Sequence, residues 1–227
     1  MSTTADNPYA FLSTFDTVFL IDDSGSMAGR SWKETAQALK AITPICTAHD
    51  ADGIDVYFLN EKDSSEYKNI TRAVDVDAIF HSVRPRGGTP TGSRLNAILK
   101  PYLAALERKG ADNVKPLNLI VITDGVASDD VESVIIAAAK KLDRWDAPAW
   151  QIGIQFFQVG EERGAAEALR ELDDGLAEMG AGRDIVDTVP WKGESGKGLS
   201  ADVVLKTVLG AVNRRLDRKR VSLDGRH

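Results

Sequence analysis

An apolar run that ends abruptly in acidic and hydroxyl residues constrains this chain more than any other feature. Residues 17–21 read Thr-Val-Phe-Leu-Ile and are followed at once by Asp22, Asp23, Ser24, Gly25 and Ser26. Continuous apolar runs of this length suit strands that are covered on both faces, as in a parallel sheet. The strand end therefore carries carboxylate and alcohol oxygens within a few residues. Hard divalent cations prefer such ligands, and nothing in the stretch suits a soft metal.

Two later stretches add further oxygen ligands. Residues 87–92 read Gly-Gly-Thr-Pro-Thr-Gly, a turn-rich loop that offers Thr89 and Thr91 just before a helical pattern. Residues 117–125 begin with a second apolar run, which ends in the carboxylate of Asp124. Each stretch alone has a simpler interpretation, because Ser, Thr and Asp at strand-to-helix turns often cap helices without any metal. One stretch by itself is therefore a weak indication of a metal site.

Taken in order, the three stretches resemble the metal-ion-dependent adhesion site of the von Willebrand factor type A family: Asp-x-Ser-x-Ser, then Gly-Gly-Thr, then Ile-Thr-Asp-Gly. The resemblance covers most of the chain, roughly from Asp16 to Arg215. It implies an α/β fold with a Rossmann-like, doubly wound, mostly parallel six-stranded sheet, one antiparallel edge strand and helices on both faces. In such sheets, ligands bind beyond the carboxyl ends of the strands, where the strand order reverses. The family's sheet order places the first and fourth strands side by side at that point.

The resemblance also implies a set of metal ligands. The coordinating positions of the family fall on Asp22, Ser24, Ser26, Thr89 and Asp124. By this resemblance the two serines bind the cation directly, Thr89 binds directly or through water, and the two aspartates bind mostly through water. Mg²⁺ is the expected ion because it takes six oxygen ligands and gives up its waters reluctantly, and Mn²⁺ or Ca²⁺ can substitute. Thr91 stays an alternative ligand, although the Gly-Gly-Thr match favours Thr89.

The expected function follows from the charge balance around such an ion. Neutral hydroxyls in direct contact leave the cation more Lewis acidity than carboxylates would, and one position stays open for a partner's Asp or Glu. This favours a non-catalytic, metal-dependent protein-binding module. Two alternatives stay open: a subunit of a metal-dependent enzyme assembly, as some intracellular relatives are with AAA+ ATPases, and a domain with a purely structural metal. Asp23 is expected to turn away from the metal as a surface charge.

The chain offers little for catalysis by its own side chains. A serine hydrolase needs a base beside its nucleophile, yet the histidines number three and no Gly-x-Ser-x-Gly elbow is present. Residues 193–198 lack the leading glycine of a phosphate-binding loop and the hydroxyl after Lys197. Residues 50–53 lack the spacing of a calcium-binding loop. We therefore expect a binding protein and not an enzyme.

Length and composition fit one α/β domain. The 227 residues are 43% hydrophobic and carry a net charge of −6, which argues against nucleic acid or an anionic membrane as the main partner. The single cysteine, Cys46, falls in a helical apolar pattern and is expected in the core. No apolar stretch approaches the roughly 20 residues that span a bilayer, and residues 1–9 lack the pattern of a signal peptide. An intracellular, cytoplasmic protein is therefore expected.

The hydrophobic patterns divide the chain into alternating strands and helices. We expect a lead-in over residues 1–14, the domain over 15–217 and a basic tail over 218–227. Strands are expected at 17–22, 56–59, 67–71, 117–124, 152–159 and 184–189, with 67–71 at the edge of the sheet.

Helices are expected between these strands, each with one apolar face. Ser31 and Ser128 are the expected caps of two helices, and Ser200 opens the last one. Pro44 is expected to kink its helix or end it early, and Pro101 is expected to bend the helix that contains it.

Overall fold

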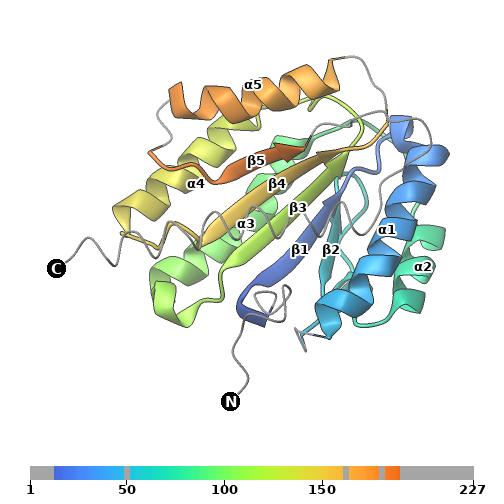
Figure 1. Ribbon diagram of the computed structural model, residues 1–227, viewed down its shortest axis with the longest axis horizontal. Coiled ribbons are helices and arrows are strands. Elements are labelled where there is room, and N and C mark those ends of the chain that lie inside the picture. Colours follow the sequence, from blue (N-terminus) through green and yellow to red (C-terminus); the bar gives the residue numbers. More distant parts are fainter. Residues whose placement is uncertain (1–12, 49–51, 161–163, 179–181, 190–227) are drawn as a thin grey trace, which may run out of the picture.

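The computed structural model describes residues 13–48, 52–160, 164–178 and 182–189. Within these ranges five strands form one sheet in the order β2-β1-β3-β4-β5, and every neighbouring pair is parallel (Figure 1). The strands are β1 Asp16–Ile21, β2 Asp55–Phe58, β3 Leu117–Thr123, β4 Ile152–Gln158 and β5 Val186–Val189. All residues of β3 and β4 are buried, as expected of central strands covered on both faces.

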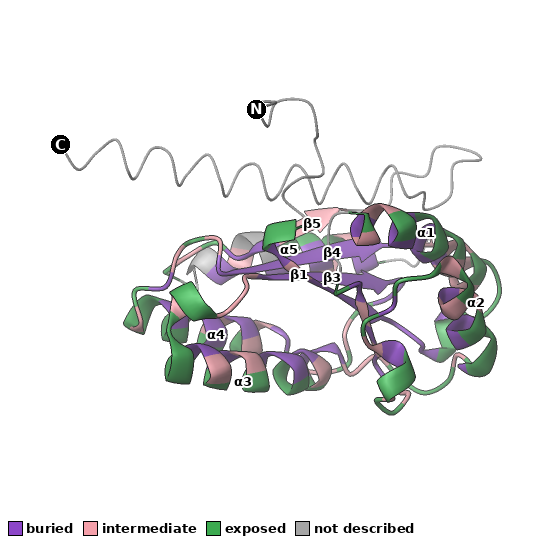
Figure 2. Cartoon of the chain, turned by 90° about the horizontal axis from the view of Figure 1, so that it is seen from below, coloured by how far each residue is buried: buried purple, intermediate pink, exposed green. Residues whose placement is uncertain are grey.

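Helices cover both faces of this sheet. They are α1 Arg30–Thr47, α2 Ala73–Ser82, α3 Thr91–Lys109, α4 Glu132–Arg144 and α5 Ala165–Glu178. Figure 2 shows α3 and α4 on the side of the sheet opposite to α1. None of the helices in the described ranges combines the length and the apolar character needed to cross a membrane.

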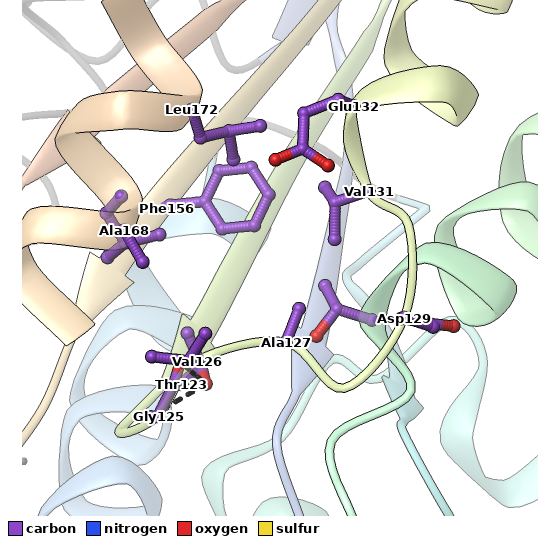
Figure 3. Close-up of a pocket in the computed structure, with 12 residues that line it drawn as sticks. Thr123, Gly125, Val126, Ala127, Asp129, Val131, Glu132, Phe156, Ala168 and Leu172 are labelled. Carbon is purple, nitrogen blue, oxygen red and sulfur yellow. Dashed lines mark hydrogen bonds between the residues drawn. The ribbon is translucent and has the colours of Figure 1, made fainter. Parts of the chain in front are cut away.

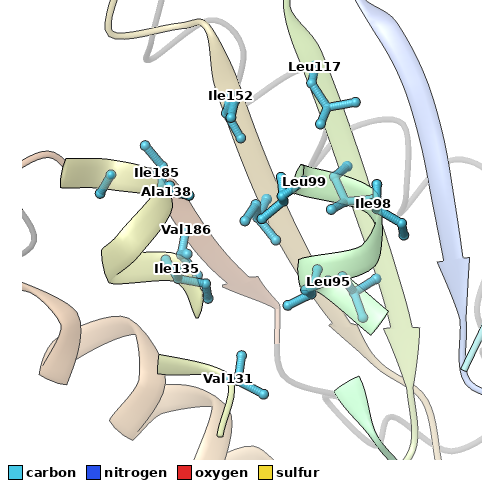
Figure 4. Close-up of a cluster of buried hydrophobic side chains, with 14 of the residues drawn as sticks. Leu95, Ile98, Leu99, Leu117, Val131, Ile135, Ala138, Ile152, Ile185 and Val186 are labelled. Atoms are coloured by element: carbon cyan, nitrogen blue, oxygen red, sulfur yellow. The ribbon is translucent and has the colours of Figure 1, made fainter. Parts of the chain in front are cut away.

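Side chains of each strand alternate between two buried clusters, one on each face of the sheet. Ile120 and Ile122 of β3 belong to the cluster under α1 and α2. Leu119 and Val121 of the same strand belong to the cluster under α3, α4 and α5, part of which is shown in Figure 4. Cys46 is buried in the first cluster, which confirms its predicted place in the core.

The predicted antiparallel edge strand at 67–71 is wrong. In the described structure this segment makes a single antiparallel bridge, in which Ile54 and Ile70 exchange backbone hydrogen bonds of 3.0 and 2.8 Å. Asn69 has a φ of 51°, in the left-handed region, and this breaks the extended conformation immediately before the bridge. The segment preceding it forms the 3₁₀ helix Ser65–Tyr67. The described sheet therefore has five parallel strands and not the expected six.

Helix α1 starts earlier than its sequence pattern suggests and reaches about the expected end. Ser31 is not its cap, because the helix already begins at Arg30, directly after Gly29 with a φ of 99°. Pro44 does not end α1, and α3 likewise continues past Pro101. A proline inside a helix removes one backbone hydrogen bond. The buried faces of both helices offset that loss, since tertiary packing supplies most of a helix's stability.

The predicted cap of α4 is also wrong. Ser128 lies in the loop before the helix, and the first turn is supported instead by Asp130, whose Oδ1 accepts a hydrogen bond of 2.9 Å from Ser133 N. Ser200 and the basic tail over 218–227 lie outside the described residues. The boundaries at 14/15 and 217/218 stay predictions from the sequence.

The strand order reverses between β1 and β3. From β1 the chain passes outward to β2 and then returns to β3 on the other side of β1. Ile21 pairs with Ile122, and Asp22 N donates a hydrogen bond of 2.9 Å to Ile122 O. The carboxyl ends of β1 and β3 therefore lie side by side, as the family resemblance implied, at the place where open α/β sheets bind ligands.

Candidate metal centre

Asp22 stands at the carboxyl end of β1 and is fully buried. Its Oδ1 accepts a hydrogen bond of 2.8 Å from Ser24 N, which folds the chain back into a tight turn after the strand. Its Oδ2 accepts a bond of 2.6 Å from the hydroxyl of Thr123, the last residue of β3. Sequence reasoning missed Thr123, although a hydroxyl directly before Asp124 on the neighbouring strand was a usable signal. These bonds hold the carboxylate of Asp22 in one orientation.

Two serines continue from Asp22 toward the end of β3. The 3₁₀ helix Gly25–Met27 lifts Ser26 to the surface, while Ser24 stays buried. Ser24 Oγ lies 3.0 Å from Ser26 Oγ, and Ser26 Oγ donates a hydrogen bond of 2.8 Å to Asp124 Oδ1. A continuous line of oxygen atoms therefore joins the loop after β1 to the loop after β3.

Thr89 lies on a loop that runs beside the serine turn. Gly25 N donates a hydrogen bond of 3.2 Å to Gly87 O, which ties the two loops together. The side chain of Thr89 is half-exposed, and its carbonyl accepts bonds of 2.8 and 2.9 Å from Thr91 N and Ser128 N. The Thr91 hydroxyl lies 3.4 Å from the same carbonyl, and Thr91 is buried. This weak bond leaves the oxygen lone pairs of the Thr91 hydroxyl available, so Thr91 stays the alternative ligand and only the Gly-Gly-Thr match favours Thr89.

Asp23 is not the surface charge expected from the sequence, because it is fully buried. Its Oδ1 accepts hydrogen bonds from Asn60 N at 2.7 Å and Asn60 Nδ2 at 3.1 Å, and its Oδ2 accepts one of 2.9 Å from Glu61 N. Burial raises the pKa of Asp23, although these hydrogen bonds act in the opposite direction. The carboxylate of Asp23 thus has different hydrogen-bond partners from the carboxylate of Asp22. It is not exposed to solvent, because the loop after β2 covers it.

Asp129 fixes the start of α3 from a different loop. Pro90 precedes the helix and has no side-chain oxygen, so it cannot cap the first turn. Asp129 supplies the missing acceptor, with bonds of 2.7 and 2.8 Å from Gly92 N and Ser93 N. Burial acts to raise the pKa of Asp129, but the hydrogen bonds from Ser93 and Gly92 outweigh it and leave the pKa below its ordinary value. The loop after β3 and the loop that carries Thr89 are thus held together.

A cavity of about 100 Å³ lies beside the candidate centre (Figure 3). Thr123 and Gly125, the neighbours of Asp124 in sequence, form part of its wall. Phe156 of β4, Leu172 of α5 and Glu132 at the start of α4 line it as well. Its volume is below the roughly 300 Å³ at which typical small-molecule sites begin. The cavity therefore does not indicate a substrate site.

The candidate centre offers hard oxygen ligands. The side chains of Ser24, Ser26 and Asp124 contact one another and Asp22 bonds to Ser24 N, whereas Thr89 is placed only on the adjacent loop; as ligands, the five would supply two carboxylates and three neutral hydroxyls. Across the described ranges, no group of three or more His, Cys, Asp or Glu residues is placed to hold a metal ion. Zinc prefers imidazole and thiolate ligands, whereas Mg²⁺ and Mn²⁺ prefer oxygen. This donor set fits Mg²⁺ or Mn²⁺ and does not fit a structural zinc ion.

The fold and this edge of the sheet define a class of protein: a doubly wound α/β domain with an oxygen-lined centre at the carboxyl ends of its strands. The sequence profile of the von Willebrand factor type A domain matches residues 16–181, well over half of the chain. The chain therefore belongs to the von Willebrand factor type A domain family. Domains of this family are generally protein-interaction modules, which agrees with the expected class.

Comparisons with individual proteins add less information than the family match does. A search of curated protein sequences finds no match to this chain. Among solved structures, the chain is similar to the manganese-loaded Plasmodium vivax TRAP protein, with a TM-score of 0.46 and 16% sequence identity. That similarity covers 79% of this chain and 70% of the other chain.

Proposed function

We propose that this domain is a non-catalytic protein-binding module that captures an Asp or Glu side chain of a partner through a divalent cation. The proposed ligands are Asp22, Ser24, Ser26, Thr89 and Asp124. The observation that carries the proposal is the line of oxygens from Ser24 through Ser26 to Asp124, in which the bond between Ser26 and Asp124 joins residues 98 positions apart in the sequence. When bound, Mg²⁺ supplies an open coordination position and a positive charge for the partner's carboxylate.

The charges of the proposed ligands suit this role. Asp22 and Asp124 together carry two negative charges, which balance one divalent cation, and the three hydroxyls add none. Coulomb repulsion would disfavour the partner's carboxylate if further carboxylates held the ion directly. In the proposed arrangement the ion contacts hydroxyls directly and the two aspartates mostly through water, so an incoming Asp or Glu meets a cation that no directly bound carboxylate has neutralised.

The burial of the proposed ligands supports access from one side. Asp22 and Ser24 are buried, whereas Ser26 is exposed and Thr89 is half-exposed. An ion at this edge would rest on buried oxygens and remain reachable from solvent. A protein partner can therefore approach it over the loops after β1 and before α3. We further propose that the domain acts inside the cell, as its sequence led us to expect.

The proposal is tested by capture of partner proteins on the immobilised domain in Mg²⁺ and again in EDTA. Ser26→Ala removes one proposed ligand, and Ser82→Ala is the matched control, because Ser82 is an exposed serine on α2 outside the centre. We expect a partner that binds the wild type and Ser82→Ala in Mg²⁺ and is lost in EDTA and with Ser26→Ala. Replacing one acidic residue of that partner should also abolish capture.

Other outcomes separate the alternatives. Capture that survives EDTA rules out the metal-dependent contact. Loss of the activity of a bound ATPase assembly in Ser26→Ala, with binding unchanged, identifies a subunit of an enzyme complex. A lower melting temperature with unchanged capture identifies a structural metal.

A further inference from the structure

The loop after β2 reaches the edge of the candidate centre. Leu59 N donates a hydrogen bond of 3.1 Å to Ile21 O, which extends the pairing of β1 and β2 by one residue. This places Asn60 beside Asp23, and both the backbone N and the side-chain Nδ2 of Asn60 donate to Asp23 Oδ1, at 2.7 and 3.1 Å. Asn60 is therefore fixed against the residue between the proposed ligands Asp22 and Ser24.

The same side-chain amide reaches the loop that carries Thr89. Asn60 Nδ2 donates a second hydrogen bond, of 2.9 Å, to Gly88 O. At Gly87, whose φ is +79°, an added Cβ would lie 2.6 Å from Asn60 Oδ1. A side chain at position 87 would therefore displace the amide group of Asn60. One amide group joins the loop after β1 to the loop before α3.

Neighbouring contacts link the same three loops. Arg86 N donates a hydrogen bond of 2.6 Å to Asp23 O, and the guanidinium of Arg86 pairs with Glu61 at 3.1 Å. The Arg86 side chain of this ion pair is exposed, so the pair contributes little to stability. The half-buried Asn60 is the side chain that contacts Asp23 and Gly88 at once.

We propose that Asn60 is a positioning residue that holds Thr89 at the distance from Ser24 and Ser26 that cation binding requires. This inference rests on the proposed function. Gly88 is the immediate neighbour of Thr89, and Asp23 is the immediate neighbour of Ser24. A hydrogen-bonded bridge between Gly88 and Asp23 therefore fixes the spacing of the two ligand-bearing loops. Residues that orient metal ligands without touching the metal commonly change affinity by about 10–100-fold when they are replaced.

The test is the affinity of the purified domain for Mn²⁺, measured by isothermal titration calorimetry. Asn60→Ala removes both side-chain bonds and keeps the backbone N–H. Asn113→Ala is the matched control, because Asn113 Nδ2 also donates a 2.9 Å bond to a carbonyl, that of Lys109, outside the centre. We expect affinity to fall about tenfold or more in Asn60→Ala and to stay unchanged in Asn113→Ala.

Two further readouts distinguish positioning from general stability. Backbone hydrogen exchange over 86–89 should quicken in Asn60→Ala, while the strands β3 and β4 keep the protection of the wild type. If Asn60→Ala lowers the melting temperature in EDTA but binds Mn²⁺ as tightly as the wild type, Asn60 has a structural role alone and the inference is overturned. If Asn60→Ala does not fold, Asn60→Ser is measured instead, because its hydroxyl is too short to span Asp23 and Gly88.

The inference and the proposed function fail in different ways. A wild-type domain that binds no Mn²⁺ overturns both. A wild type that binds Mn²⁺ and captures its partner, together with an Asn60→Ala variant of equal affinity, overturns the positioning role alone. Mn²⁺ binding that depends on Asn60 without any metal-dependent capture overturns the partner-binding function and keeps the positioning role.

Discussion

The hydroxyl of Thr123 donates a hydrogen bond of 2.6 Å to Oδ2 of Asp22, across the two strands at which the sheet order reverses. Both residues are buried, so the bond is shielded from water. It joins the last residue of β3 to the first residue after β1. The candidate centre is thus anchored to the sheet and not only to its loops.

Replacing Thr123 with Val should therefore destabilise the domain. The shape of the side chain is kept, but Asp22 loses a donor inside the protein, and a buried acceptor without its partner costs about 1–3 kcal/mol. Urea unfolding in EDTA measures this loss. Thr43→Val is the control, because Thr43 is a buried threonine whose hydroxyl donates to Leu39 O within α1. A weaker Mn²⁺ affinity is expected in Thr123→Val alone, and equal affinities in both variants would contradict the role given to Thr123.

The sequence was sufficient to predict that Asp22 and Asp124 directly follow two buried strands. Apolar runs that stop at Asp22 and Asp124 mark two buried parallel strands, and the chain between them is long enough for a crossover. Placing the two strands side by side needed the family resemblance, because hydrophobic periodicity carries no information on sheet order. The structure then joins both ends through Ser24 and Ser26.

What the sequence did not reveal depends on tertiary contacts. Asp23 has other hydrogen-bond partners than Asp22, but it is buried against Asn60 and Glu61, which are distant in the sequence. An asparagine directly after a short apolar strand was a signal for Asn60 that we did not use. The edge strand predicted at 67–71 does not form, because the left-handed backbone at Asn69 interrupts the pairing.

A second prediction concerns pH. The pKa of Asp129 in the folded state lies below the unfolded value of about 3.9, since the bonds from Ser93 and Gly92 outweigh burial. Between the folded and the unfolded pKa of Asp129, the unfolded chain therefore binds more protons than the folded protein. The stability that Asp129 contributes is present above pH 4 and is lost as the pH falls through the folded pKa. Asp129→Ala should cost about 1 kcal/mol at neutral pH, as the loss of a helix cap does. The variant should also lose less stability than the wild type between about pH 5 and pH 2.

Melting temperatures at a series of pH values check this. Asp112→Ala is the control, because Asp112 is an exposed aspartate in the 3₁₀ helix Ala111–Asn113. The cap assigned to Asp129 is wrong if both variants follow the wild-type curve with no offset at neutral pH.

A third prediction concerns the metal. A ligand that binds the folded state stabilises it by about 2.7 kcal/mol at 100 times its Kd, which corresponds to a rise in Tm of roughly 5–10 °C for a domain of this size. Magnesium should therefore raise the Tm of the wild type, and EDTA should reverse the rise. Ser24→Ala should respond much less, and Ser82→Ala should respond as the wild type does. Potassium chloride at matched ionic strength separates binding from screening of surface charges. The absence of any shift at millimolar Mg²⁺ would be incompatible with the assigned centre.

The last prediction concerns two polar side chains inside the sheet. Asn118 of β3 and Gln155 of β4 are fully buried, and Gln155 Nε2 donates a bond of 3.2 Å to Asn118 Oδ1. Asn118 Nδ2 and Gln155 Oε1 are left without a hydrogen-bond partner. Replacing Gln155 alone with Met should cost about 1–3 kcal/mol, because the whole amide of Asn118 then remains unpaired. Adding Asn118→Leu should restore most of that stability, since two apolar side chains of similar shape bury no unpaired group. Urea unfolding of both single variants and the double variant measures the coupling. Additive losses would show that the two amides do not depend on each other.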